Sequence, residues 1–154
     1  MKKLRVGIAG TGYTVGIAAM HVNGYQSQKE NCEIVALYDI LPGRAAQWAK
    51  EKNLDVKICS SFEELLKEVD VVSLCVPNDQ HMPLLQMAFA AGKHVLCEKP
   101  MATNLADCEA MVQAADANGK FLMIGHNQRL AKAHSLARKL IVEGLIGDII
   151  TFRT

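Results

Sequence analysis

Short runs rich in Val, Ile and Leu alternate along the chain with longer helix-like runs, and this alternation restricts the possible folds more than any other feature. The strand-like runs cover residues 4–9, 33–38, 56–59, 71–76, 94–97 and 121–125. The helix-like runs between them cover about 15–27, 42–52, 61–69, 79–91 and 104–118. Alternating strands and helices without an internal repeat predict a parallel sheet that is covered by helices on both faces. The expected fold class is therefore α/β, with a doubly wound parallel sheet of the Rossmann type.

Residues at the ends of the helix-like runs support these boundaries. Pro42 suits the first turn of a helix, and Ser60 or Ser61 suits the cap of the next helix. Gly92 and Gly119 suit the positions that follow a helix C-terminus. The helices are therefore expected to begin and end near these residues.

A further helix-like run at about 129–143 follows the last strand, and residues 147–154 read as the start of another strand. A domain does not normally end on an unpaired strand, so we expect more chain to follow. The expected organisation is a first domain over residues 1–125. Residues 126–154 are then a junction helix and the first strand of a truncated C-terminal α/β domain.

The composition argues against several classes of protein. Lys and Arg number 17 against 16 Asp and Glu, without a basic cluster, which argues against a nucleic-acid partner. No apolar stretch approaches the roughly 20 residues of a membrane span, and residues 1–10 read as a strand rather than a secretion signal. An odd number of cysteines without CxxC spacing favours reduced thiols in a cytoplasmic protein and argues against a metal site. These cysteines are Cys32, Cys59, Cys75, Cys97 and Cys108.

A glycine-rich turn, Gly10-Thr11-Gly12, follows the first strand directly. Glycine permits a tight turn and lets backbone N–H groups approach a pyrophosphate at the N-terminus of the next helix. The third small residue of such a motif would fall at Val15, but the glycine comes one position later, at Gly16. A Gly-x-Gly pair is a weak signal by itself, and an ordinary strand-to-helix turn remains the alternative.

Asp39 ends the second strand, where an acid in this fold accepts hydrogen bonds from the adenosine ribose hydroxyls. The alternative is an ordinary cap for the helix near Pro42. As a ribose ligand, Asp39 favours NAD over NADP because its charge repels a 2′-phosphate. Arg44 in the next helix offsets part of that repulsion.

Two polar segments follow the fourth and fifth strands, at the carboxyl edge where open α/β sheets bind ligands. The first is Val-Pro-Asn-Asp-Gln-His at 76–81, and the second is Glu98-Lys99-Pro100. Asn78 or Asp79 can instead cap a helix, and His81 can be a surface histidine of its first turn. A lysine at the position of Lys99 is also more often solvated than catalytic, so the position alone leaves both interpretations open.

Taken in order, these motifs and Gly-His-Asn-Gln-Arg at 125–129 closely resemble the N-terminal half of the Gfo/Idh/MocA family of glucose-fructose oxidoreductases and inositol dehydrogenases. The resemblance covers residues 4–154 and is most specific at 91–101, which contain the Glu-Lys-Pro run. It implies a Rossmann domain followed by an α/β domain with a large open sheet. It also implies an oxidoreductase that uses NAD or NADP and acts mostly on sugars, cyclitols and related polyols.

The resemblance assigns roles to individual residues. Lys99 is the expected catalytic residue, which holds the substrate oxygen and helps to move its proton, while Pro100, often preceded by a cis bond, fixes its direction. For cofactor binding, the pyrophosphate cradle is assigned to Gly10, Gly12, Tyr13 and Thr14, and the ribose contact to Asp39. The nicotinamide-ribose side is assigned to Pro77, Asn78 and His81, and the nicotinamide itself to Glu98 with Lys99.

Two features depart from the family pattern. His21 lies farther from the glycine turn than the corresponding histidine of the family, by about one helical turn, so the helix start is expected to be displaced. The C-terminal domain, which in the family supplies the substrate pocket and commonly an Asp-x-x-x-His pair, is missing. We therefore expect residues 1–154 alone to be inactive.

The sequence thus predicts the nicotinamide-dinucleotide-binding part of an oxidoreductase, with NAD preferred over NADP. The expected partners are a polyol or sugar substrate and further copies of the same chain, with neither nucleic acid nor membrane. The alternative from another class is a non-catalytic sensor or regulatory module in which Lys99 only steadies the cofactor. A dehydrogenase of the amino-acid pathways is a lesser alternative, against which the Glu-Lys-Pro run argues.

Overall fold

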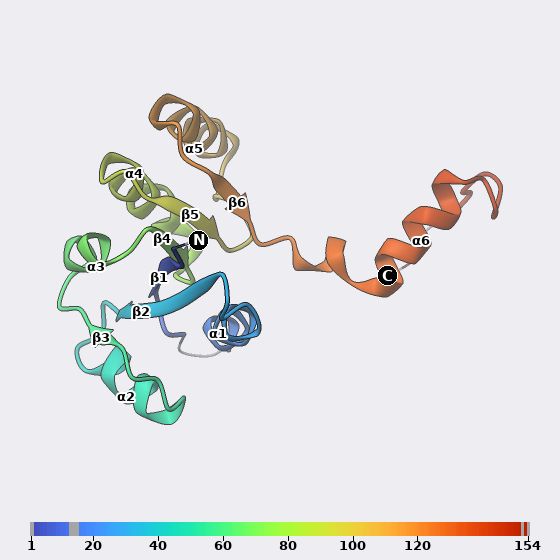
Figure 1. Ribbon diagram of the computed structural model, residues 1–154. Helices are drawn as coiled ribbons and strands as arrows, with labels where there is room; N and C mark the ends of the chain where they lie inside the picture. The colour runs from blue at the N-terminus through green and yellow to red at the C-terminus, as the bar shows by residue number, and fades with distance from the viewer. Residues whose placement is uncertain (1, 13–15, 152, 154) are drawn as a thin grey trace.

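The computed structural model describes residues 2–12, 16–151 and 153 and shows a parallel sheet flanked by helices (Figure 1). The sheet has six strands in the order β3-β2-β1-β4-β5-β6. All neighbouring strands pair in parallel. The strands are β1 Leu4–Ala9, β2 Cys32–Tyr38, β3 Lys57–Ile58, β4 Val71–Leu74, β5 His94–Cys97 and β6 Leu122–Ile124. The predicted doubly wound α/β fold is confirmed.

The helices lie in the predicted order between the strands. They are α1 Ile17–Ser27, α2 Arg44–Glu51, α3 Phe62–Glu68, α4 His81–Ala90, α5 Leu105–Asn118 and α6 Lys132–Val142, with short 3₁₀ turns η1 Asn78–Gln80 and η2 Asn127–Leu130. Of the two possible caps for α3, Ser61 is the one used, because its hydroxyl accepts the backbone N–H of Glu64. Gly119 follows α5 with φ of 59°, as expected of a C-terminal glycine. Pro42 lies before α2 rather than in its first turn, since Gly43 is the N-cap.

Two separate clusters of buried side chains hold the helices against the sheet. The larger joins α3, α4 and α5 to the strands through residues such as Leu65, Phe89 and Met111. The smaller joins α1 and α2 to the other face through residues such as Val22 and Trp48. Successive side chains of a strand point to opposite faces, so both faces of this sheet are covered by apolar contacts.

The order of the strands determines where a ligand can bind. β1 lies between β2 and β4, so β2 and β3 are added on one side of β1, and the chain then returns to add β4 on the other side. Connections on either side of such a switch point diverge to opposite faces and leave a crevice at the carboxyl ends of the strands. Gly10 and Cys75 follow β1 and β4 at this crevice.

The part of the chain after β6 differs from the prediction in two ways. The helix expected over 129–143 is divided into η2 and α6, and α6 lies apart from the sheet (Figure 1). The strand expected over 147–154 is absent from the described residues 147–151 and 153. A strand needs a neighbour for its backbone N–H and C=O groups, and no described strand pairs with this segment.

Within the described residues, no helix combines the length and the apolar character needed to cross a bilayer.

Candidate functional site

A cleft of about 710 Å³ opens at the carboxyl ends of the strands around the switch point. Residues that follow four different strands line it, so the fold gathers side chains that are far apart in the sequence. The predicted site residues among its lining are Gly10, Gly12, Asp39, Pro77, Asn78, Glu98 and Lys99. Tyr13 and Thr14 lie outside the described residues.

The glycine turn brings the backbone of β1 against the end of β4. A Cβ atom at Gly10, which has φ of +84°, would lie 2.6 Å from the carbonyl oxygen of Cys75, so only glycine fits there. Gly12 also has positive φ, +77°, but no atom of the described residues, its chain neighbours aside, comes within 4 Å of the place that a Cβ would take. The turn thus leaves room above Gly12 for a ligand to approach the backbone, and α1 begins beyond it at Ile17.

Asp39 is fixed by the glycine turn as well as by its own loop. Its Oδ2 accepts hydrogen bonds from the backbone N–H and the hydroxyl of Thr11, at 2.8 and 2.6 Å. Its Oδ1 accepts the backbone N–H of Leu41 at 3.0 Å. Oδ1 has one more lone pair, which makes it the atom of Asp39 that can accept a hydroxyl in the cleft.

Arg44, at the start of α2, holds the same turn from the other side of the cleft. One terminal guanidinium nitrogen donates to the carbonyl oxygen of Gly12 at 2.6 Å. Its Nε is buried and has no hydrogen-bond partner among the described residues. The contact of Thr11 with Asp39 and that of Arg44 with the Gly12 carbonyl are not predicted from the residue pattern, because each joins segments that only the fold brings close.

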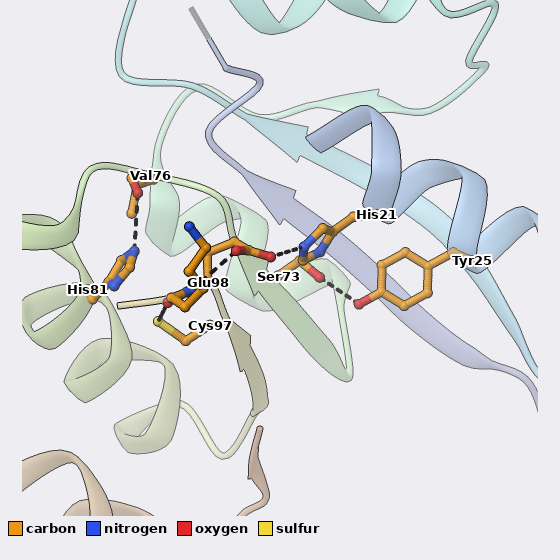
Figure 2. Close-up of polar contacts among 8 residues, drawn as sticks. His21, Tyr25, Ser73, Val76, His81, Cys97 and Glu98 are labelled. Carbon is orange, nitrogen blue, oxygen red and sulfur yellow. Dashed lines mark hydrogen bonds and ion pairs between the residues drawn. The ribbon is translucent and has the colours of Figure 1, made fainter. Parts of the chain in front are cut away.

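Glu98 is nearly buried, with 8% of its surface exposed, yet it borders the cleft. Its Oε1 lies 2.8 Å from Nε2 of His21 in α1, and its Oε2 accepts the backbone N–H of Lys99 at 3.2 Å. Figure 2 shows the His21 ring and the Glu98 carboxylate pointing toward one another. A Cβ at Gly125 would lie 2.6 Å from Oε1, so the carboxylate also occupies the space beside that glycine.

Lys99 is exposed and lines the cleft, and the bond between Lys99 and Pro100 is cis, as expected from the resemblance. Its ammonium group makes no hydrogen bond or ion pair with any described residue. Lys99 thus presents an exposed cation to the cleft, next to the buried carboxylate of Glu98.

His81, expected on the nicotinamide-ribose side, lies elsewhere than the other residues of that group. The side chain is completely buried and does not line the cleft. Its Nδ1 faces the carbonyl oxygens of Pro100 and Met101, at 3.1 and 3.2 Å. Its Nε2 faces the carbonyl oxygen of Val76 at 3.1 Å (Figure 2). His81 thus ties the segment after β4 to the loop after β5 instead of contacting a ligand.

Two buried thiols, Cys75 in the lining of the cleft and Cys97 in β5, stay protonated. Burial, and then the charge of Glu98, raises the pKa of Cys75 to about 12. The same two causes raise the pKa of Cys97 to about 12. A thiol of such high pKa is a poor nucleophile and metal ligand at neutral pH. Neither thiol is therefore a candidate nucleophile or metal ligand in the cleft.

These features fit a dinucleotide. The space above Gly12 admits a pyrophosphate to the backbone, and Oδ1 of Asp39 can accept a ribose hydroxyl. The unpartnered Nε of Arg44 is a buried donor at the same end of the cleft. A dinucleotide bound there would extend toward Glu98 and Lys99 at the other strands.

Comparison with known proteins agrees with this geometry. Residues 4–126 match the model of an oxidoreductase family with an NAD-binding Rossmann fold. The chain is 36% identical over 153 residues to an uncharacterized oxidoreductase of Streptococcus pneumoniae and 32% identical over 148 residues to inositol 2-dehydrogenase of Salmonella typhimurium. These alignments cover 98% and 94% of this chain but only 40% and 43% of the relatives.

A solved structure with the same fold is apo scyllo-inositol dehydrogenase from Lactobacillus casei, with a TM-score of 0.83 and 26% identity. The match covers 96% of this chain and 44% of that protein. The chain thus spans less than half the length of these relatives. Since the family model covers most of the 154 residues, the chain belongs to the Gfo/Idh/MocA oxidoreductase family and forms its NAD-binding Rossmann fold.

Proposed function

We propose that this chain is the cofactor-binding part of an oxidoreductase that moves hydride between NAD(P) and a secondary alcohol of a sugar, cyclitol or related polyol. The observation that carries the proposal is the convergence of a glycine turn, a strand-end carboxylate and an exposed lysine on one cleft. Membership of an NAD-binding oxidoreductase family supports the cofactor class. Relatives named inositol 2-dehydrogenase and scyllo-inositol dehydrogenase support the substrate class.

The cofactor is held along the switch point of the sheet. Gly10 and Gly12 present backbone N–H groups to the pyrophosphate, and Asp39 accepts a ribose hydroxyl. Pro77 and Asn78 border the nicotinamide ribose, as their place in the cleft supports. Tyr13 and Thr14 complete the pyrophosphate cradle in this proposal, on the strength of the resemblance alone. His81 supports the neighbouring loops and is not a ligand.

The proton chemistry belongs to Lys99. Nicotinamide supplies the hydride-accepting chemistry when it is bound. Lys99 holds the alcohol oxygen of the substrate and takes up or returns its proton. Glu98, which borders the nicotinamide end of the cleft in this proposal, accepts the backbone N–H of Lys99. Residues outside 1–154 complete the substrate pocket, so the chain alone binds cofactor without polyol turnover.

The test of this proposal is a pair of measurements on Lys99→Ala. In the chain of 154 residues, the variant should bind NADH within a few-fold of wild type by isothermal titration. In the full-length product of the gene, it should lower kcat for inositol oxidation by about 10²–10⁴-fold, the usual contribution of a general acid or base. Wild-type turnover by the variant would favour the non-catalytic sensor. No binding of NADH or NADPH to the wild-type chain would contradict the whole proposal.

We further propose that NAD is preferred over NADP. The carboxylate of Asp39 repels a 2′-phosphate, while Arg44 is already engaged with the carbonyl of Gly12. NADH should therefore bind more tightly than NADPH. Asp39→Ala should weaken NADH binding and so reduce the difference in affinity between NADH and NADPH. Asp55→Ala, at an exposed position outside the cleft, is the matched control. Tighter binding of NADPH by the wild type would show that Asp39 does not select the cofactor.

The setting of the protein is also a proposal. All five cysteines are free and four of them are buried, which supports a reducing compartment such as the cytoplasm. Apolar side chains exposed between residues 130 and 150 support a homo-oligomer. We retain the division into a dinucleotide-binding domain over 1–125 and a junction segment over 126–154.

A further inference from the structure

The contact between His21 and Glu98 joins the two ends of the proposed cofactor site. His21 belongs to α1, the helix that begins just beyond the glycine turn. Glu98 belongs to the loop after β5, which carries Lys99. The two side chains lie 2.8 Å apart and are only 8% and 11% exposed. A carboxylate this well buried needs a hydrogen-bond donor, and His21 supplies it from another element.

Glu98 transmits this contact to the backbone of the loop. Its second oxygen accepts the N–H of Lys99, so the carboxylate bridges α1 and the start of the Lys99-Pro100 segment. The same carboxylate lies close to Gly125, since a Cβ atom there would be 2.6 Å from its Oε1. A displacement of Glu98 therefore displaces the backbone of Lys99.

His21 is itself held in place by the next turn of its helix. The hydroxyl of Tyr25, four residues later, shares a hydrogen bond with the hydroxyl of Ser73 in β4 (Figure 2). The rings of His21 and Tyr25 meet edge to face, with centroids 6.4 Å apart. Among the described residues, Nδ1 of His21 has no hydrogen-bond partner, so the bond to Glu98 is the polar contact that orients the ring.

We propose that His21 and Glu98 are positioning residues, which hold the nicotinamide end of the cleft in register with the pyrophosphate end. The proposal rests on the proposed function, since it assumes that a nicotinamide dinucleotide binds in this cleft. If the pair acts in this way, the affinity for the dinucleotide has two separable parts. The adenosine and pyrophosphate part depends on the glycine turn and Asp39, whereas the nicotinamide part depends on the loop that the pair holds.

The test compares NADH with ADP-ribose, which has the same adenosine, pyrophosphate and second ribose but lacks the nicotinamide. Dissociation constants of both are measured by isothermal titration on the chain of 154 residues. Wild type should bind NADH more tightly than ADP-ribose. His21→Leu keeps an apolar body but removes the donor, and it should weaken NADH about tenfold, the effect of one hydrogen bond to a charged group. The dissociation constant of ADP-ribose should change less than twofold.

Two more variants separate positioning from general destabilisation. His21→Gln keeps an N–H donor near the position of Nε2 and should restore most of the preference for NADH. Glu98→Gln still accepts from His21 but turns an amide N–H₂ group toward the N–H of Lys99, so it should lose the preference even if His21→Leu does not fold. Asn23→Ala, at an exposed position of the same helix, is the control and should keep the preference for NADH. Circular dichroism establishes that each variant is folded.

Three results would overturn the inference while leaving the proposed function intact. The first is an equal loss of affinity for NADH and ADP-ribose in the variants. The second is an unchanged preference for NADH over ADP-ribose in both His21→Leu and Glu98→Gln. The third is a wild type that binds the two ligands with equal affinity. A wild type that binds neither NADH nor ADP-ribose would instead contradict the proposed function.

Discussion

Cys75 follows β4 and lines the cleft, and Cys97 is the last residue of the neighbouring strand β5. Both are almost fully buried, whereas Cys108 in α5 is partly exposed. Alkylation requires an accessible thiolate, and the pKa of both buried thiols is raised to about 12. Iodoacetamide at pH 8 should therefore modify Cys108 at least about 100-fold faster than either buried cysteine.

Mass spectrometry of peptides after timed quenching measures these rates. The same reaction in concentrated urea is the control, because unfolding exposes all three thiols and should make their rates similar. Equal labelling of Cys97 and Cys108 in the native protein would show that the strand ends open readily.

At the scale of single residues, the sequence predicts which residues line the cleft better than it predicts the contacts that support them. Gly10, Asp39 and Lys99 each follow a strand, and parallel strands bring their carboxyl ends to one edge, so their convergence could be predicted. The burial of His81 could not, because it depends on carbonyl groups of a loop some twenty residues later. The pairing of His21 with Glu98 likewise depends on how α1 lies across the sheet.

At the scale of elements, Arg5 and Asp70 connect β1 with the start of β4. Asp70 accepts hydrogen bonds from the backbone and the guanidinium of Arg5, the shortest at 2.7 Å. The hydrogen bond from this guanidinium lowers the pKa of Asp70 from 3.8 to about 2. The folded state therefore holds the ionised form more strongly than the unfolded state does. This contribution to the free energy of unfolding is complete above the unfolded pKa and is lost as pH falls through the folded pKa.

Asp70→Asn should thus lower the free energy of unfolding at pH 7 by about 1 kcal/mol or less, because solvent screens a partly exposed pair. Urea titrations at pH 7 and pH 2 measure the difference between variant and wild type, which should shrink at the lower pH. Asp55→Asn, at an exposed position, should show no such dependence. A difference that stays constant between the two pH values would mean that the ionised carboxylate is not what stabilises the strand pair.

The sequence also predicts where most elements lie, because local patterns decide them. Strands β1 and β5 begin and end at the predicted residues, and the other strands differ by a few residues at their ends. The segment over 147–154 shows the limit of this reasoning. Its apolar residues are typical of a strand, but a strand is stabilised by a neighbour, and a local pattern does not show whether one is present.

At the scale of the whole molecule, residues 130–150 expose a series of apolar side chains, whereas both faces of the sheet are covered by helices. They include Leu130, Val142, Leu145 and Ile150, which are 75%, 69%, 66% and 96% exposed. Exposed apolar area of this extent is typical of surfaces that bind another protein. We expect the chain of 154 residues to self-associate through this segment.

Sedimentation velocity over a range of concentrations measures the association. The double variant Leu145→Lys and Ile150→Lys should shift the chain toward monomer because it places charge on the exposed segment. Leu105→Lys is the matched control, since Leu105 is also exposed, at 71%, but lies at the start of α5. A wild type that sediments as a monomer at every concentration would contradict this expectation.

The lack of space between Gly125 and Glu98 has a consequence for how this chain can vary. A methyl group at 125 would overlap the carboxylate, so the two positions are not independent. In a library randomised at both and selected for folded protein, alanine or serine at 125 should be depleted among the members that keep glutamate at 98. Where alanine or serine does appear at 125, position 98 should more often carry a shorter side chain, which would also give up the contact with His21. The end of β6 and the loop after β5 should therefore vary together.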